Sequence, residues 1–195
     1  MAGPLVGLGR RFKRAGLDVV AVDGWRERGY DDFDPRGTVF HHTASNRHSG
    51  PAPSLGIVTH GRAGIPGPLC NILIARNGKI FLVAGGKANH AGLGGPLRGI
   101  PRDSANRYTV GFEVENDGVG ERWSRELIRA CDLAFAITLE FVKERAGRHF
   151  GHKEWAPDRK IDPARLDMDD DRRRVRRLLR GLDREKKRRR PKGHR

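Results

Sequence analysis

The dipeptide Asn77-Gly78 between two apolar runs is the strongest constraint that this sequence places on its fold. The runs at residues 69–75 and 80–84 flank it, and Asn-Gly between β-prone segments is the typical turn of a tight hairpin. The sequence therefore predicts an antiparallel pair of strands here. Further β-prone runs lie at residues 17–22, 38–42 and 108–115.

Helices are predicted at residues 5–16, 124–146 and 167–182. Ser124 and Asp167 can cap the second and third, and the second carries its apolar residues three and four positions apart. The Gly-rich residues 85–106 are predicted to form a long surface loop. Strands mixed with helices indicate an α/β or α+β domain.

Positive charge is concentrated at one end of the chain. The net charge is +15, and residues 172–195 hold 14 Lys/Arg and two acids, a net of +12, so residues 1–171 carry only +3. We therefore assign residues 1–182 to one folded domain and residues 183–195 to a basic tail, which cannot bury enough apolar surface to fold. Such a tail is expected to attract nucleic acid, anionic membranes or acidic wall polymers without much selectivity.

The sequence predicts neither export by the usual route nor a disulfide. No apolar run approaches the ~20 residues that cross a bilayer. The short apolar segment 1–8 precedes its basic residues, which is the reverse of a secretory signal. Cys70 and Cys131 belong to no Cys-x-x-Cys pair and are expected to be buried free thiols.

A few polar residues could form a catalytic zinc site, for which two imidazoles, a carboxylate and a water suffice. His41 and His42 end a predicted strand, and His152 precedes Asp162 by ten residues. Adjacent strand residues point to opposite faces, so only one of the histidine pair can face a given metal. Composition alone favours the simpler interpretation, that these residues are surface or core filler, because widely spaced ligands are weak evidence.

Two further pairs have the spacing that catalysis needs. Glu113 and Glu115 lie two apart on a predicted strand and so face the same side, which does not say which one is a base. Lys160 and Asp162 are also two apart, so an extended segment would point the cation and the carboxylate the same way. A Lys beside a metal can stabilise a tetrahedral oxyanion.

Four segments, in order, resemble the type 2 N-acetylmuramoyl-L-alanine amidases, a family related to peptidoglycan-recognition proteins and the T7-type phage lysozyme. They are Phe40-His41-His42-Thr43-Ala44-Ser45, Asn89-His90-Ala91-Gly92, Gly111 to Asn116, and Gly151-His152 through Lys160-Ile161-Asp162-Pro163. The resemblance covers roughly residues 17–180. Pro68-Leu69-Cys70-Asn71 and the Glu-Asn-Asp-Gly at 115–118 look like the amidase domains of actinobacterial phage endolysins.

The resemblance implies a mixed central β-sheet flanked by helices, with one zinc ion in an open groove. It matches His41, His152 and Asp162 to the zinc ligands, Glu113 to the catalytic carboxylate and Lys160 to the residue near the oxyanion. His90 matches a histidine that lines the groove. Trp155, between His152 and Lys160, is a further candidate to touch the substrate, although core packing is the simpler interpretation.

The implied function is cleavage of the bond between muramic acid and L-alanine in peptidoglycan by a monomeric endolysin. Such an enzyme stays in the cytoplasm of the host until lysis releases it to the cell wall. One alternative is a cytoplasmic amidase that recycles wall fragments, which explains the basic tail less well. A non-catalytic binding module would typically lack a zinc ligand, and no helix-turn-helix or aromatic-basic motif supports specific binding of nucleic acid.

Overall fold

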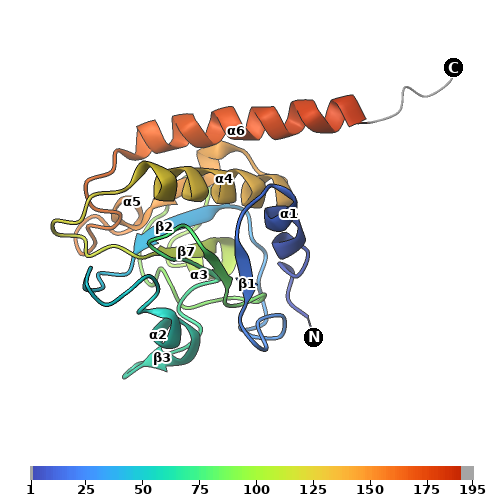
Figure 1. Cartoon of the computed structure of the whole chain (residues 1–195). Helices are drawn as coiled ribbons and strands as arrows, with labels where there is room; N and C mark the ends of the chain where they lie inside the picture. Colours follow the sequence, from blue (N-terminus) through green and yellow to red (C-terminus); the bar gives the residue numbers. More distant parts are fainter. Residues whose placement is uncertain (1, 190–195) are drawn as a thin grey trace, which may run out of the picture.

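A six-stranded mixed sheet forms the centre of the computed structural model, which describes residues 2–189 (Figure 1). The strand order is β1-β6-β5-β7-β2-β8. The strands are β1 (Val19–Ala21), β2 (Thr38–His42), β5 (Ile72–Ile74), β6 (Ile80–Leu82), β7 (Val110–Val114) and β8 (His149–Gly151). Only β5 and β6 pair antiparallel, and the other neighbours are parallel. The hairpin predicted at Asn77-Gly78 is therefore confirmed, with Gly78 at a φ of 79° that its lack of a side chain permits.

The helices are α1 (Leu8–Arg14), α2 (Leu55–His60), α3 (Ala105–Tyr108), α4 (Arg125–Phe141), α5 (His152–Trp155) and α6 (Met168–Arg189), with a 3₁₀ turn η1 at Ala146–Arg148. Helices α1, α4 and α6 pack on one face of the sheet, whereas α2 and α3 pack on the other. Phe135 of α4 packs its ring against Phe40 of β2 and Phe112 of β7. Helix α6 runs along the outer side of α4 (Figure 1). The predicted mixed α/β fold with flanking helices is confirmed.

On the opposite face of the sheet, the loop between β6 and α3 crosses the central strands. The His90 ring lies where a Cβ on Gly111 would stand, 2.4 Å from the His90 Cγ. Cys70 and Cys131 are free and buried, as predicted. Within residues 2–189, no helix is both long and apolar enough to span a bilayer.

Several short elements escape sequence-based prediction. They are α2, α3, which takes up the end of the predicted loop and the first residue of the predicted strand, the turn η1, the two-residue strands β3 (Gly61–Arg62) and β4 (Ile65–Pro66), and the strand β8 with α5 behind it. Each is too short to show a periodicity of its own. Helix α4 ends at Phe141 and not at residue 146, because the chain turns at Lys143, whose φ is 60°.

Helix α6 continues to Arg189, seven residues past the predicted end at Leu182. Residues 183–189 are mostly Arg, Lys and Glu, which are good helix formers, and Lys186 forms an ion pair with Glu140 of α4. This part of the predicted tail is helical and extends beyond the body (Figure 1). Residues 190–195 of that tail lie outside the described residues.

A buried polar network fixes the start of α6 to the sheet. The fully buried Asp171 carboxylate lies 2.6 Å from Nε2 of His149 on β8, and the other ring nitrogen of His149 lies 2.8 Å from the Thr38 hydroxyl. Arg174, one turn on, pairs with both Asp171 and Asp132 of α4. These contacts connect α6, α4, β2 and β8 through polar groups, of which His149 and Asp171 are fully buried and Arg174 is partly exposed.

We expect Asp171→Ala to cost about 1–3 kcal/mol of unfolding free energy, because the fully buried His149 loses the partner of its Nε2 while Arg174 keeps only Asp132. Asp170→Ala is the matched control, since Asp170 is 57% exposed and pairs only with the exposed Arg173. That change should cost at most about 1 kcal/mol. Urea unfolding of the two variants measures the difference, and equal losses would show that the network does not anchor α6.

Candidate metal centre and active site

The pairing of β2 with β7 places two candidate residues side by side. In this parallel register His41 lies opposite Glu113 and Phe40 lies opposite Phe112. Alternation along a strand sends the two phenylalanines to the α4 face and the other pair to the opposite face. His42 therefore points away from His41, and its Nδ1 accepts a hydrogen bond of 3.1 Å from the Ala164 amide. Of the two adjacent histidines, the fold selects His41.

Three donor atoms from distant parts of the chain converge beside His41. The Nδ1 atoms of His41 and His152 are 2.9 Å apart, and Asp162 Oδ2 lies 3.1 and 3.0 Å from them. All three residues are buried. His152 opens α5 directly after β8, whose pairing with β2 brings it to the end of the same strand.

The second nitrogen of each histidine fixes where its proton sits. His152 Nε2 donates to the Ala91 carbonyl at 2.9 Å. His90 Nε2 donates to the Thr109 carbonyl at 3.2 Å, so its Nδ1 can accept from His41 Nε2 at 3.0 Å. Burial, together with His152, lowers the pKa of His41 to about 4, and burial also lowers that of His90, so both are neutral at pH 7. In these tautomers the Nδ1 atoms of His41 and His152 carry lone pairs.

This arrangement fits a divalent metal ion. Two imidazole lone pairs and a carboxylate oxygen, about 3 Å apart, repel one another unless a cation lies among them. Donors about 2.0–2.1 Å from a tetrahedral zinc ion lie about 3.3 Å from one another, which is close to these separations. The second nitrogen of His152 binds a backbone carbonyl, which is a usual support of a metal-binding histidine. The second nitrogen of His41 binds the His90 imidazole, which fixes the ring in the same way.

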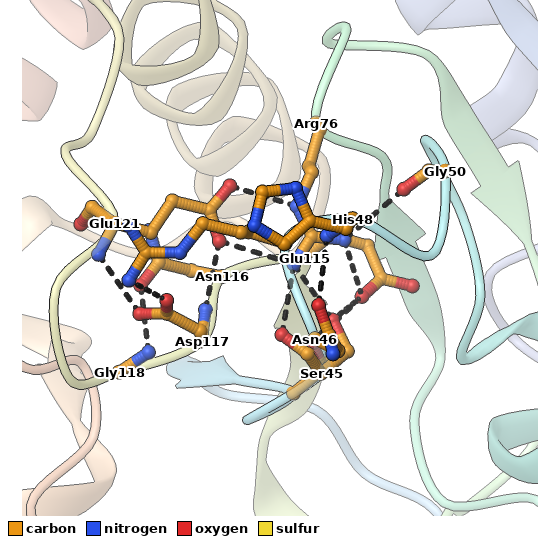
Figure 2. Close-up of polar contacts among 12 residues, drawn as sticks. Ser45, Asn46, His48, Gly50, Arg76, Glu115, Asn116, Asp117, Gly118 and Glu121 are labelled. Atoms are coloured by element: carbon orange, nitrogen blue, oxygen red, sulfur yellow. Dashed lines mark hydrogen bonds and ion pairs between the residues drawn. The ribbon is translucent and has the colours of Figure 1, made fainter.

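The two glutamates of β7 have different surroundings. Glu115 is fully buried, and its carboxylate accepts hydrogen bonds from Thr43, from Ser45 and from both the amide and the hydroxyl of Ser54. Arg76 lies 3.7 Å from it and pairs with Glu121 at 2.7 Å (Figure 2). Glu115 thus holds the loop that follows β2.

Glu113, in contrast, has a buried Oε2 with no hydrogen-bond partner among the described residues. Burial raises the pKa of Glu113 well above its usual value, the carboxylates of Asp162 and Glu115 act in the same direction, and Lys160 opposes them. A carboxyl group with a free oxygen on the His41 side of the sheet is suited to carry a proton.

Lys160 lies near this cluster. Its charge lowers the pKa of both His41 and Glu113, although burial is the main influence on each. The backbone of Lys160 is fixed by a hydrogen bond to the Ala156 carbonyl, and Asp162 follows two residues later. The structure therefore brings together five of the predicted site residues: His41, Glu113, His152, Lys160 and Asp162.

The other two predicted residues lie behind this cluster. His90 is 8% exposed and contacts His41 edge-on. Trp155 is 1% exposed, stacks on Phe150 and donates its indole N–H to the Gly92 carbonyl. A ring with both faces covered has no surface to offer a substrate. The position of Trp155 therefore matches core packing, the simpler interpretation of this residue.

The bond between His90 and His41 is a feature that sequence reasoning missed. One signal was available, because a glycine inside a strand often marks the close approach of another group. Gly111 is that glycine, and the His90 ring occupies the space beside it.

Solved structures with a similar fold include proteins described as N-acetylmuramoyl-L-alanine amidases. AmpD is 21% identical, with 85% of this chain and 95% of AmpD covered at a TM-score of 0.62. The amidase LysC from Clostridium intestinale is 17% identical to this chain and has a TM-score of 0.57. The comparison covers 81% of this chain and 97% of LysC. AmpDh3 from Pseudomonas aeruginosa was solved with an anhydromuramic pentapeptide. It is 23% identical to this chain and has a TM-score of 0.56, and the comparison covers 78% of this chain and 65% of AmpDh3. At such identities the likeness shows the fold alone.

Sequence comparison supplies the family. A search of curated protein sequences finds no match. The family profile Amidase_2, described as N-acetylmuramoyl-L-alanine amidase, matches residues 31–165, which is more than two thirds of the chain and includes all five clustered residues. The chain therefore belongs to this family and is an N-acetylmuramoyl-L-alanine amidase acting on peptidoglycan.

Proposed function

We propose that this amidase depends on one zinc ion, held by His41, His152 and Asp162, and that it digests the intact cell wall as an endolysin does. The observation that carries the zinc assignment is the convergence of two imidazole lone pairs and one carboxylate oxygen within 3.1 Å. When bound in a site of this kind, zinc polarises a carbonyl group and lowers the pKa of water to about 7.

Glu113 moves the proton in this proposal. Its carboxylate takes a proton from the attacking water and returns it to the leaving amine of L-alanine. Glu115 does not compete for this task, because its two oxygens already accept four hydrogen bonds from the loop after β2. The free Oε2 of Glu113 keeps its capacity for the reaction.

Lys160 stabilises the negative charge that develops on the oxygen of the scissile carbonyl. An ammonium group held beside a buried site acts strongly, since little water screens it. Its influence on His41 and Glu113 supports this position.

Action on the intact wall is supported by the charge of α6. Its exposed surface is rich in Arg and Lys, which attract the acidic polymers of a wall. A recycling amidase acts on small soluble fragments and gains nothing from such a surface. Incubation with purified walls and with a soluble muropeptide distinguishes the roles: an endolysin releases new L-alanine N-termini from both, and a recycling enzyme only from the muropeptide.

We expect near-stoichiometric zinc in the purified protein and its loss in His41→Ala and His152→Ala. His42→Ala is the matched control, because His42 points to the other face and bonds to the Ala164 amide. Elemental analysis measures zinc content. Full zinc in His41→Ala together with loss in His42→Ala would reverse the choice between the adjacent histidines.

We expect Glu113→Gln to keep the fold and the zinc but to lower kcat by about 10²- to 10⁴-fold, as for a lost general base. Glu115→Gln should lower the melting temperature instead, since it disturbs a fully buried hydrogen-bonded carboxylate. Turnover per folded molecule, with melting curves, separates the two. A stable Glu115→Gln protein that has lost turnover, beside an active Glu113→Gln, would assign the proton transfer to Glu115.

For His90 we expect a positioning role, exerted through His41. His90→Phe keeps a ring in place but removes the acceptor for His41 Nε2, and should weaken zinc binding by about 10- to 100-fold. Competition with a chelator measures this affinity. If His90 binds the substrate instead, the variant will show a raised KM with unchanged zinc affinity.

A further inference from the structure

A second concave site lies away from the metal centre, between α6, η1 and the loop at residues 98–99. Its volume is about 630 Å³. Five of its ten lining residues are arginines, and among those ten Asp183 is the one acid. The arginines, which we call the arginine groove, are Arg98, Arg145, Arg148, Arg176 and Arg180.

One of these arginines is held in place by the loop. Arg148 donates to the Arg98 carbonyl at 2.5 Å. Arg98 is in the left-handed region, with φ 48°, and Gly99 follows with φ 76°. A Cβ on Gly99 would lie 2.3 Å from the Arg148 guanidinium, so only glycine permits this approach. Such strained backbone persists only where its surroundings hold it, and it is often found at binding sites.

The charges of the groove are poorly compensated within the protein. Arg176 and Arg180 are exposed, lie one helical turn apart and form no ion pair with any residue from 2 to 189. Like charges at this spacing repel each other. The guanidinium groups of Arg98 and Arg148 each lie 3.6 Å from one carboxylate oxygen, of Glu154 and Glu144 respectively. The buried Nε of Arg98 has no hydrogen-bond partner in the described part of the chain.

The groove is separate from the catalytic residues. It includes the turn η1, which enters β8, whereas His152 follows the other end of that strand. Three residues of extended chain span about 10 Å. An anion could therefore occupy the groove while the metal centre holds the substrate.

We propose that the arginine groove binds phosphodiester groups of an anionic wall polymer. Guanidinium groups bind phosphate through paired hydrogen bonds, and several of them along a groove match a chain of repeated phosphates. A flat membrane surface does not enter a concave site. No aromatic residue lines the groove as described, so it offers no stacking platform for bases. This inference rests on the proposed action on the intact wall.

The test compares two double variants of α6. Arg176→Gln/Arg180→Gln removes two charges from the groove, whereas Arg173→Gln/Arg177→Gln removes two exposed charges with the same spacing outside it. The probe is soluble poly(glycerol phosphate), with duplex DNA of equal phosphate concentration alongside. We expect the groove variant to lose affinity for the polymer on the order of 10-fold or more, and the control less than about 2-fold.

Two further measurements isolate the groove. Arg176→Lys/Arg180→Lys keeps the charge but not the paired geometry, and should bind the polymer more weakly than the parent. All variants should cleave a soluble muropeptide at the parent rate. If the parent protein releases no L-alanine N-termini from purified walls, the proposed action on the wall is refuted, and polymer binding is judged on its own.

Equal losses of polymer affinity in the two glutamine variants would overturn the proposal, because the attraction would then come from the overall charge of α6. Stronger binding of DNA than of the polymer, with the same dependence on Arg176 and Arg180, would overturn it in favour of a nucleic-acid site.

Discussion

The parallel pairing of β2 with β7 and β8 determines where the candidate active site of this amidase forms. It places the ends of three strands together and puts His41 opposite Glu113. A slip of one residue along β2 would turn His41 toward α4 and put Phe40 in its place. The aromatic packing of Phe40 and Phe112 on Phe135 resists such a slip, so the apolar face of the sheet secures the geometry of the polar face.

On that polar face, hydrogen bonding separates two glutamates that the sequence leaves equivalent. Each buried carboxylate has a desolvation cost, which only hydrogen bonds or charges offset. Glu115 is fully compensated and binds the loop after β2 to the sheet. Glu113 has a buried oxygen with no hydrogen bond to offset this cost, and the pKa of its carboxyl group is raised as a result. An uncompensated group in a stable domain is what a proton carrier requires, because its bonding capacity must remain available to the reaction.

The sequence predicts features that depend on neighbours along the chain. The Asn77-Gly78 hairpin, the strand at β7 and the long helix α4 follow from turn chemistry and apolar spacing. Strand alternation predicts that only one of His41 and His42 can face a given metal. The choice of His41 comes from the family resemblance. The bond between His90 and His41 joins residues 49 positions apart, and Gly111 inside β7 is its one trace in the sequence. Strand β8 is only three residues long and leaves no pattern of its own.

Helix α6 shows how remote parts of this fold act on the candidate metal centre through β8. His149, in the first position of that strand, is fixed by Asp171 of α6, and His152 follows the last position. The docking of α6 therefore sets the position from which the chain delivers one of the three donor atoms. The face of α6 that carries Arg176 and Arg180 makes no contribution of this kind, since these side chains are exposed and unpaired among the described residues. Their mutual repulsion costs stability in the free protein. Helix α6 therefore combines a buried face that supports β8 with an exposed face whose positive charge remains available to an anionic ligand.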